Sequence, residues 1–510
     1  MGGTMLGRRA TAIVASTLLL VAGLASLPGA QASEPERTTT TVESFDGTEI
    51  DTLVCQPADA SAEDPAPVVM HSHGWGGSRA DDCASFDALL DAGFGVVSVT
   101  QRGFGNSGGE AHVHDPDLEG QDNKAVIDHV ASLPWVQTEG PQDPVMGAIG
   151  GSYGGGYQFI TALTEIQETG DTRLDALAPE ITWYDLVQSL APDDVIRSVW
   201  VDALYAAGAT NVHQGIHEAF AYGLATGQLP DGTVPGVHDV VADFTENSPA
   251  GFVSDGVQLD VPTLMRQGLT DNLFTLNQAV DNYQRTLTAD ARADSYLVGY
   301  NGGHALPNAY PPGTLASGDP CSSVGDHEGF DELRLAFLEN QLTGADNPMP
   351  GTAYRLATDD GGCLAVDSVE PTQTVDAGPA QVAATPSGAG APVYLPLTEG
   401  PTTVAGVPQL DATLTTAGVD QRAFLGLAVG PSPAQAQMLS NNVLPVQRDL
   451  PVAQEDLSME LPGVATEVAE DETLYLVVSP TSDMFVHHGS RTPGTVAFED
   501  VEVGLPVPAS

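Results

Sequence analysis

The segment from residue 145 to residue 157 constrains the fold of this chain more than any other. It reads Val145-Met-Gly-Ala-Ile-Gly-Gly-Ser-Tyr-Gly-Gly-Gly-Tyr157, a short apolar run followed by glycines around one serine. The apolar run predicts a buried strand, and the pattern Gly150-x-Ser152-x-Gly154 predicts a sharp turn into a helix. Such a turn needs small residues because a bulky side chain would clash beneath the serine. The sequence therefore predicts a nucleophile elbow that exposes Ser152 above a sheet.

The surroundings of the motif support this interpretation, which matters because a chain with 56 glycines can match a short pattern by chance. Short apolar runs alternate with amphipathic ones, which indicates parallel strands with helices on both faces and a ligand site at the carboxyl ends of the strands. The glycine-rich segments 73–78 and 101–108 each follow a predicted strand, as the elbow does. The predicted strands are 68–71, 95–100 and 145–150, and the predicted helices are 84–92 and 120–133.

The rest of the chain divides into three regions. Residues 164–259 break the alternation apart from a strand at 174–181, and their helical segments 183–207 and 213–226 predict a helical cap at about 182–258. The alternation then resumes with strands 261–268 and 295–300 and helices 273–288 and 329–342. After residue 345, short β-rich runs between Pro, Gly and Asp clusters predict a β-sandwich. We therefore expect an α/β catalytic domain over 33–345 and a C-terminal all-β domain over 346–510.

The first 32 residues have the order of a secretory signal. Arg8 and Arg9 precede an apolar run over 12–27, and Ala30-Gln-Ala32 offers a cleavage site. We expect a mature, secreted chain that begins near Ser33 and is not inserted in a membrane. A retained membrane anchor is the alternative, and the pattern leaves open whether export follows the general or the twin-arginine route.

Charge and cysteine content narrow the environment and the partners. The formal charge is −52, and removing the two arginines of the signal leaves 14 bases against 68 acids, or −54. Nucleic acid is therefore excluded as a partner by repulsion. Four cysteines in an exported chain suggest two disulfides, and we favour Cys55–Cys83 and Cys321–Cys363 because each closes a loop within one region. The sequence alone does not fix this pairing.

An acid and a base follow the elbow in the order of α/β-hydrolases. Asp271 directly follows the predicted strand 261–268, and His304 follows the next strand in a glycine turn. A serine hydroxyl needs a histidine to take its proton and a carboxylate to orient that histidine. We therefore predict a Ser152, Asp271, His304 triad on an α/β-hydrolase fold. Asp271 could instead only cap the helix that follows it.

Acyl transfer also needs donors for a developing oxyanion. The backbone amides of Tyr153, next to the serine, and of Trp75, in the loop His73-Gly-Trp-Gly-Gly77, are the candidates. We expect no cofactor and no metal. Residues 115–120 resemble the start of a calcium loop, but the twelfth position is Val126, which cannot chelate. The pairs His71/His73 and His112/His114 have no further ligands at useful spacing.

These residues together resemble the family of X-prolyl dipeptidyl peptidases and cocaine-esterase-like acyl hydrolases. The resemblance covers nearly all of the mature chain and depends on the elbow, the acid and base turns and a set of other motifs. Those motifs are His73-Gly-Trp-Gly-Gly77, Arg102-Gly-Phe-Gly-Asn-Ser-Gly-Gly109, Glu119-Gly-Gln-Asp122 and the 179–186 stretch with Trp183 and Asp185. The resemblance implies a serine hydrolase domain with a helical cap, a C-terminal jelly-roll (galactose-binding-like) domain that helps to wall the pocket, and no cofactor.

Two features of the resemblance concern substrate binding. Family members often carry a tyrosine in the first-strand loop whose hydroxyl helps to hold the oxyanion, whereas this chain has Trp75 there. Dipeptidyl peptidases also need carboxylates for the free amine of the substrate. The candidates for that role are Glu180, Asp185, Asp193 and Asp194.

The sequence thus predicts a serine hydrolase that forms an acyl-enzyme on Ser152. We place an X-Pro dipeptidyl-peptidase-like activity on peptides first. A cocaine-esterase-like carboxylesterase or acylase, or an α-amino acid ester hydrolase, is the alternative within the enzyme class. A non-catalytic extracellular binding protein on the same scaffold is the alternative outside it. The acyl group, the leaving group and the oligomeric state are not determined by the sequence.

Overall fold

The structure is a computed structural model that describes residues 36–304, 319–386 and 390–508. The expected signal segment 1–32 lies outside the described residues. Within them, helices long and apolar enough to cross a membrane are absent.

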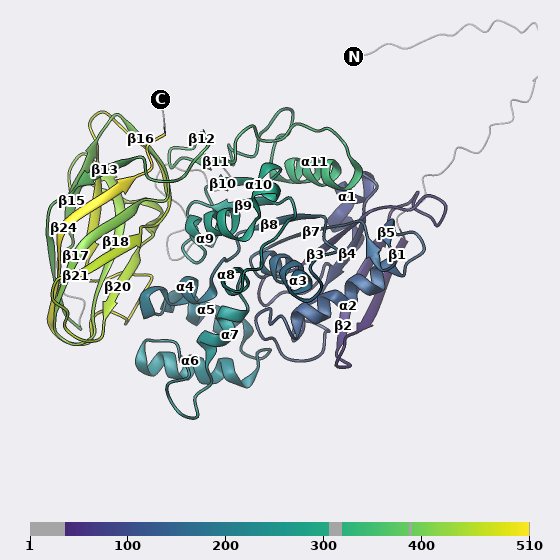
Figure 1. Cartoon of the computed structure of the whole chain (residues 1–510), viewed down its shortest axis with the longest axis horizontal. Helices are drawn as coiled ribbons and strands as arrows, with labels where there is room; N and C mark the ends of the chain where they lie inside the picture. The colour runs from purple at the N-terminus through teal and green to yellow at the C-terminus, as the bar shows by residue number, and fades with distance from the viewer. Residues whose placement is uncertain (1–35, 305–318, 387–389, 509–510) are drawn as a thin grey trace, which may run out of the picture. The chain divides into compact units, whose positions relative to one another are not determined.

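A ten-stranded sheet forms the centre of the catalytic domain (Figure 1). Its strands run in the order β1-β2-β4-β3-β7-β8-β9-β10-β11-β12, and those from β4 to β11 are parallel. All six strands predicted for this domain are present, which confirms the α/β-hydrolase fold class. The bounds are β1 Glu36–Glu43, β2 Glu49–Gln56, β3 Val68–Ser72, β4 Gly95–Val99, β7 Met146–Gly151, β8 Ala176–Glu180, β9 Leu264–Gly268, β10 Tyr296–Tyr300, β11 Tyr354–Ala357 and β12 Cys363–Val366.

Alternation along the strands builds one apolar cluster on each face of the sheet. In β3, Met70 joins the cluster with helices α2 and α3, while Val69 joins the cluster with α1 and α11. This is the period of two that a strand imposes on its side chains. Because both faces are covered, the middle strands are buried at nearly every position. The helices of this domain are α1 Asp87–Asp91, α2 Glu119–Ala131, α3 Tyr153–Thr169, α9 Leu276–Asp281, α10 Ala289–Ala293 and α11 Phe330–Thr343.

The sheet extends beyond the expected domain boundary at residue 345. Strands β11 and β12 come after that boundary, yet β11 pairs with β10 and β12 pairs with β11. The boundary therefore moves to the segment between Val366 and Gln373. Strands β1 and β2 were not predicted either, and Glu36–Glu43 is an exposed and mostly polar edge strand. The predicted helix 273–288 is slightly shorter in the structure, where α9 begins at Leu276, ends at Asp281 and continues as a π-helix over Asn282–Thr286.

The segment between β8 and β9, where a cap was expected, is mostly helical. Its helices are α4 Leu186–Leu190, α5 Ser198–Gly208, α6 Gln214–Thr226, α7 Val240–Glu246 and α8 Pro249–Ser254. Figure 1 shows α5, α6 and α7 grouped together. The segment 183–207 is not one helix, because Pro192 follows the end of α4 and the chain becomes irregular before α5.

The C-terminal domain is a β-sandwich. One sheet holds β13-β24-β17-β21 with β14 also paired to β24, and the other holds β15-β23-β18-β19 with β20 also paired to β18. Apolar side chains from both sheets fill a single cluster between them. The bounds are β13 Gln373–Asp376, β14 Ala380–Ala384, β15 Val393–Glu399, β17 Gln409–Ala417, β18 Gln421–Gly430, β19 Gln437–Met438, β20 Leu444–Arg448, β21 Glu455–Glu460, β23 Thr473–Ser479 and β24 Gly494–Leu505, with a separate pair β16 Thr402–Gly406 and β22 Val464–Val468. A short hairpin, β5 Thr138–Gly140 and β6 Asp143–Pro144, lies before β7.

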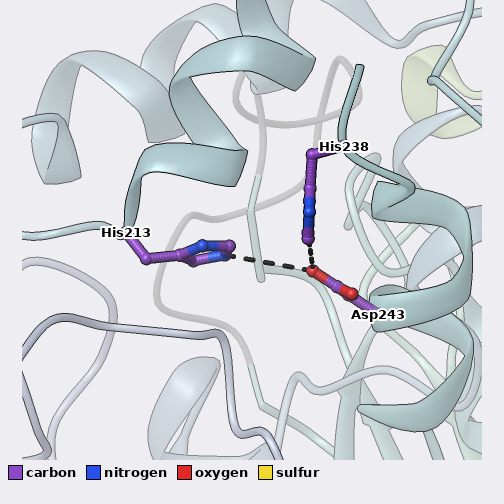
Figure 2. A group of neighbouring side chains, drawn as sticks. All are labelled: His213, His238 and Asp243. Carbon is purple, nitrogen blue, oxygen red and sulfur yellow. Dashed lines mark hydrogen bonds and ion pairs between the residues drawn. The ribbon is translucent and has the colours of Figure 1, made fainter. Parts of the chain in front are cut away.

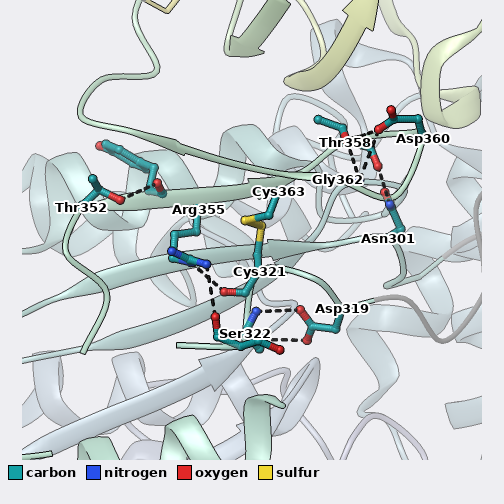
Figure 3. The surroundings of a disulfide bond; sticks show 12 residues. Asn301, Asp319, Cys321, Ser322, Thr352, Arg355, Thr358, Asp360, Gly362 and Cys363 are labelled. Carbon is teal, nitrogen blue, oxygen red and sulfur yellow. Dashed lines mark hydrogen bonds between the residues drawn. A yellow bond between two sulfur atoms is a disulfide. The ribbon is translucent and has the colours of Figure 1, made fainter. Parts of the chain in front are cut away.

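The structure pairs the cysteines as expected. Cys55 bonds Cys83 and Cys321 bonds Cys363, with Cα atoms 5.8 and 5.2 Å apart. Figure 3 shows that the second disulfide joins the segment after residue 318 to β12, where Arg355 also donates from Nε to the carbonyl oxygen of Cys321. Nearby, Asn301 donates to the carbonyl oxygen of Thr358. These contacts fix the ends of β10 and β11 next to the base turn.

A buried ion pair explains two motifs that carried the resemblance. Arg102 donates from Nε and Nη2 to both oxygens of Asp122, at 2.8 and 2.7 Å, and from Nη1 to Asp46. The Asp122 side chain is 2% exposed. These contacts hold the pKa of Asp46 well below its usual range and raise that of Arg102 further, with burial opposing both shifts. The ion pair connects α2, the loop after β4 and the hairpin before β2.

Breaking this pair should destabilise the fold. Asp122→Asn leaves the Arg102 guanidinium buried without one of its carboxylates, so the free energy of unfolding should fall by about 3–5 kcal/mol in urea titrations. Asp128→Asn is the matched control, because Asp128 lies on the same helix in an exposed ion pair with Arg173. That control should cost less than about 1 kcal/mol. Equal losses in the two variants would contradict the assignment.

Candidate active site

Ser152 lies at the apex of the predicted strand-to-helix turn. It stands between β7 and α3 with φ 58° and ψ −121°, a backbone conformation that non-glycine residues rarely adopt. A Cβ atom on Gly154 would lie 2.3 Å from the carbonyl oxygen of Ser72, and one on Gly150 would lie 2.4 Å from that of Gly154. The glycines are therefore required for β3 and α3 to approach the turn this closely.

Asp271 follows β9 and its side chain is completely buried. Its Oδ1 accepts hydrogen bonds from the backbone N–H groups of Leu273 and Phe274, at 3.0 and 2.8 Å. Its Oδ2 faces His304. The two roles considered for Asp271 are thus both present, because one oxygen caps the turn that follows and the other is left for the histidine.

His304 connects Asp271 to Ser152. Its Nδ1 lies 2.7 Å from Asp271 Oδ2 and its Nε2 lies 2.8 Å from Ser152 Oγ. Since an ionised carboxylate only accepts, the proton belongs on Nδ1 and Nε2 is the acceptor for the serine hydroxyl. The backbone N–H of His304 also donates to Asp271 Oδ2, at 2.9 Å. The ring edges of Trp200 and Phe274 pack at right angles to the imidazole and restrict its rotation.

The acid turn is held by the cap and by the sandwich. From the cap, Arg197 donates to the carbonyl oxygen of Asn272 at 2.8 Å, and Trp200 donates to Asn272 Oδ1 at 2.9 Å. From the sandwich, Asn442 donates from Nδ2 to the carbonyl oxygen of Asp271 at 3.0 Å. Arg197 is completely buried, and burial lowers its pKa to about 10. Two parts of the chain that are distant from Asp271 in sequence therefore hold the turn that carries this carboxylate.

The two expected oxyanion residues lie beside Ser152. Trp75, Ser152 and Tyr153 line the same cavity. The indole N–H of Trp75 donates to the carbonyl oxygen of Leu204 in the cap, at 2.9 Å, so it is engaged in holding the cap. His73 braces the loop from within, because its Nδ1 pairs with the Gly74 carbonyl and its Nε2 accepts the backbone N–H of Gln101. Backbone amides therefore remain as the donors that this loop offers.

A large apolar cavity opens next to Ser152 beneath the cap. Its volume is about 1030 Å³, counting space that is open to solvent. Among the described residues that line it, the one carboxylate is Asp202, which is exposed. The remaining lining is mostly aliphatic and aromatic: Trp75, Val113, Tyr153, Trp183, Leu186, Leu190, Ile196, Val201, Leu204, Tyr205, Val212, Ile216, Ala219, Phe220, Gly223, Leu224, Leu229, Phe244, Leu273, Phe274 and His488. Burial lowers the pKa of His488 to about 4, so this histidine is neutral at pH 7.

The four expected amine-binding carboxylates are not among the residues that line this cavity. Glu180 pairs with Arg266 and Arg334, each at 2.8 to 2.9 Å. Asp185 caps α4 by accepting from the backbone of Gln188, and burial raises its pKa. Asp193 accepts a hydrogen bond from the backbone N–H of Gln447 in the sandwich. Asp194, the next residue, is exposed.

The segment that mimics a calcium loop has a structural explanation. Glu119 turns inward and accepts the backbone N–H groups of His112 and Asp115. Burial raises the pKa of Glu119 to about 8. Its carboxyl group therefore closes the turn 112–115 instead of facing solvent.

Sequence reasoning missed Asn442, Arg197, Trp200 and Asp202. An asparagine in a strand-rich region and an arginine in a helical cap match no motif, and their partners lie on turns far along the chain. The one sequence feature that pointed toward Arg197, Trp200 and Asp202 was the predicted helical cap, because a cap is expected to cover the carboxyl ends of the strands.

Comparison with known proteins places this geometry in a family. The sequence profile of the X-Pro dipeptidyl-peptidase family, S15, matches residues 46–305, just over half of the chain. The chain belongs to this family. It is therefore a hydrolase of the X-Pro dipeptidyl-peptidase and cocaine-esterase type, as the resemblance implied. No curated protein matches the sequence.

Three solved structures share this fold over nearly the whole chain. An α-amino acid ester hydrolase superposes with a TM-score of 0.66 at 15% identity, covering 96% of this chain and 100% of its own. An aminopeptidase from a marine sediment Thaumarchaeota archaeon superposes with a TM-score of 0.63 at 14% identity, covering 95% of this chain and 98% of its own. A CocE/NonD family hydrolase from Staphylococcus aureus superposes with a TM-score of 0.61 at 14% identity, covering 94% of this chain and 97% of its own. At these identities the similarity establishes the fold.

The contact from the sandwich to the acid turn should matter for turnover. Asn442→Ala removes the donor to the Asp271 carbonyl, so the acid should shift and kcat should fall by roughly tenfold to a hundredfold with little change in KM. Asn277→Ala is the matched control, because Asn277 donates across the same junction to the Leu461 carbonyl, away from the triad. Steady-state kinetics on an aryl ester would compare them. Equal kcat values for both variants would refute a positioning role for Asn442.

Proposed function

We propose that the protein is a serine acyl hydrolase in which Ser152 is the nucleophile, His304 the general base and Asp271 the residue that orients it. The observation that supports this most directly is the hydrogen-bonded chain from Ser152 Oγ through His304 to Asp271, at 2.8 and 2.7 Å, at the edge of a cavity. The strained backbone at Ser152 adds support, because such strain is kept where it serves a site.

The reaction follows from these positions. His304 Nε2 takes the hydroxyl proton as Ser152 Oγ attacks the substrate carbonyl carbon, and Asp271 stabilises the imidazolium that forms. The backbone amides of Tyr153 and Trp75 would donate to the oxyanion, each worth roughly 2.7–4 kcal/mol in comparable sites. His304 then returns the proton to the leaving group, and water repeats the sequence to release the acid.

Replacing the nucleophile tests this mechanism. A fluorophosphonate probe should label the wild-type protein at Ser152, and Ser152→Ala should lose both labelling and turnover, because no other hydroxyl is hydrogen-bonded to His304 in the described residues. Mass spectrometry of the labelled peptide gives the site, and Ser322→Ala, in the segment next to the second disulfide, serves as the control. Turnover retained in Ser152→Ala would sink the mechanism.

The cavity favours an ester or amide with a bulky apolar acyl group as substrate. An acyl group that enters beside Ser152 meets aliphatic and aromatic side chains from both the cap and the hydrolase core. An acyl group in this cavity would bury its apolar surface against these side chains and would find few hydrogen-bonding partners. Such a cavity suits a hydrocarbon chain or an aromatic ring. This moves an acyl esterase or amidase ahead of the dipeptidyl peptidase that the sequence favoured.

An X-Pro dipeptidyl peptidase is the second candidate, and one residue supports it. Asp202, on α5, is the carboxylate among the described cavity residues, and a free amine of a dipeptide could pair with it. The family profile and the name of the archaeal aminopeptidase with the same fold agree with this candidate.

Substrate profiling separates the two candidates. An acyl esterase should hydrolyse p-nitrophenyl esters faster as the acyl group grows, and Ala219→Trp should lower kcat/KM for the largest acyl group by roughly 10- to 200-fold because it fills the cavity. A dipeptidyl peptidase should prefer Xaa-Pro-p-nitroanilides, and Asp202→Asn should abolish that preference. Faster turnover of acetate than of every larger ester would contradict the apolar acyl pocket.

A further inference from the structure

A cluster of imidazole and carboxylate groups lies in the cap, away from Ser152. His213 precedes α6, His238 lies in the loop before α7, and Asp243 belongs to α7. Their ligand atoms all lie within 4.8 Å of one another. Figure 2 shows both rings directed at the Asp243 carboxylate, with His238 Nε2 at 2.6 Å and His213 Nε2 at 4.0 Å from Oδ2.

We propose that His213, His238 and Asp243 bind one Zn²⁺ ion, with water completing the coordination. Two histidines and one carboxylate around an open position are a usual donor set for this ion. In a zinc site each ligand atom lies about 2 Å from the ion. To reach that geometry, the distances from His238 Nε2 and His213 Nε2 to Asp243 Oδ2 would each have to change by less than about 1 Å. The site is independent of the proposed acyl transfer. The three ligands come from segments that show no common motif, so the spacing of residues in the sequence does not indicate this site.

The hydrogen-bonding geometry of the cluster is compatible with a bound cation. His238 and His213 each direct Nε2 at the same carboxylate oxygen, so a cation can take the place of the protons between them. Coordination through Nε2 moves the remaining proton to Nδ1 and breaks one weak bond, in which Nδ1 accepts from the backbone of Gly215 at 3.2 Å.

The location of the cluster gives the ion a structural role in the substrate pocket. His213 directly precedes α6, and α6 supplies Ile216, Ala219 and Phe220 to the cavity beside Ser152. The ring of His112, next to the cavity residue Val113, stacks on His213 with centroids 4.1 Å apart. A metal ion would therefore fasten the start of α6 to α7 and hold one wall of the cavity in place.

Zinc titration of the full, untagged protein tests the proposal. After treatment with a chelator, isothermal titration with Zn²⁺ should show one site per chain, and Zn²⁺ should raise the melting temperature. His238→Ala and Asp243→Asn should each weaken Zn²⁺ binding by more than about a hundredfold, the upper end of what the loss of a partner outside the coordination sphere costs. Both variants should lose the zinc-dependent rise in melting temperature.

His327→Ala is the matched control, because the part-exposed ring of His327 pairs with the Pro348 carbonyl and with none of the three proposed ligands. It should bind Zn²⁺ like the wild-type chain. Comparing each variant with and without Zn²⁺ separates metal binding from any stability that the His238–Asp243 hydrogen bond provides by itself. The proposal fails if the wild-type chain binds no Zn²⁺, or if the variants at 238 and 243 bind it as tightly as the wild type.

Discussion

The arrangement of this protein depends on one buried carboxylate. Asp271 is fully removed from solvent, and a buried charge is tolerated only when hydrogen bonds and an opposite charge compensate for lost hydration. Two backbone N–H groups bind one of its oxygens, while the ring and backbone of His304 bind the other. Because these four donors come from the turns after β9 and β10, the carboxylate fixes both turns and therefore the distance from His304 to Ser152.

This requirement explains why the cap and the sandwich both contact the acid turn. Arg197 and Trp200 bind Asn272 from the cap, and Asn442 binds the Asp271 carbonyl from the sandwich. The turn that carries Asp271 has to stay in place, because a shift of about 1 Å in a catalytic group can lower the reaction rate by two orders of magnitude. The added regions thus contribute rigidity to the proposed catalytic groups as well as walls to the cavity.

Much of the fold was predictable because it follows from local patterns. Alternating apolar runs predicted the parallel strands, and the pattern around Ser152 predicted its turn, since few residues other than glycine can occupy positions 150 and 154. Asp271 and His304 could be chosen because each follows a strand in the order that the fold requires. Strands β1, β2, β11 and β12 were not predicted. Of these, β1 and β12 lie at the edges of the sheet, and an edge strand needs little apolar character to pair with a neighbour.

The sequence by itself determined the α/β-hydrolase scaffold and predicted the three residues of the proposed triad, because short-range patterns specify strands, turns and their order. Only the tertiary structure decided how the substrate cavity is lined, that Asp202 and not Glu180, Asp185, Asp193 or Asp194 faces it, and that Asn442 supports Asp271. The same holds for the cluster of His213, His238 and Asp243. The physical reason is that these contacts join segments tens to hundreds of residues apart, and a contact of that kind leaves no periodicity or spacing in either segment.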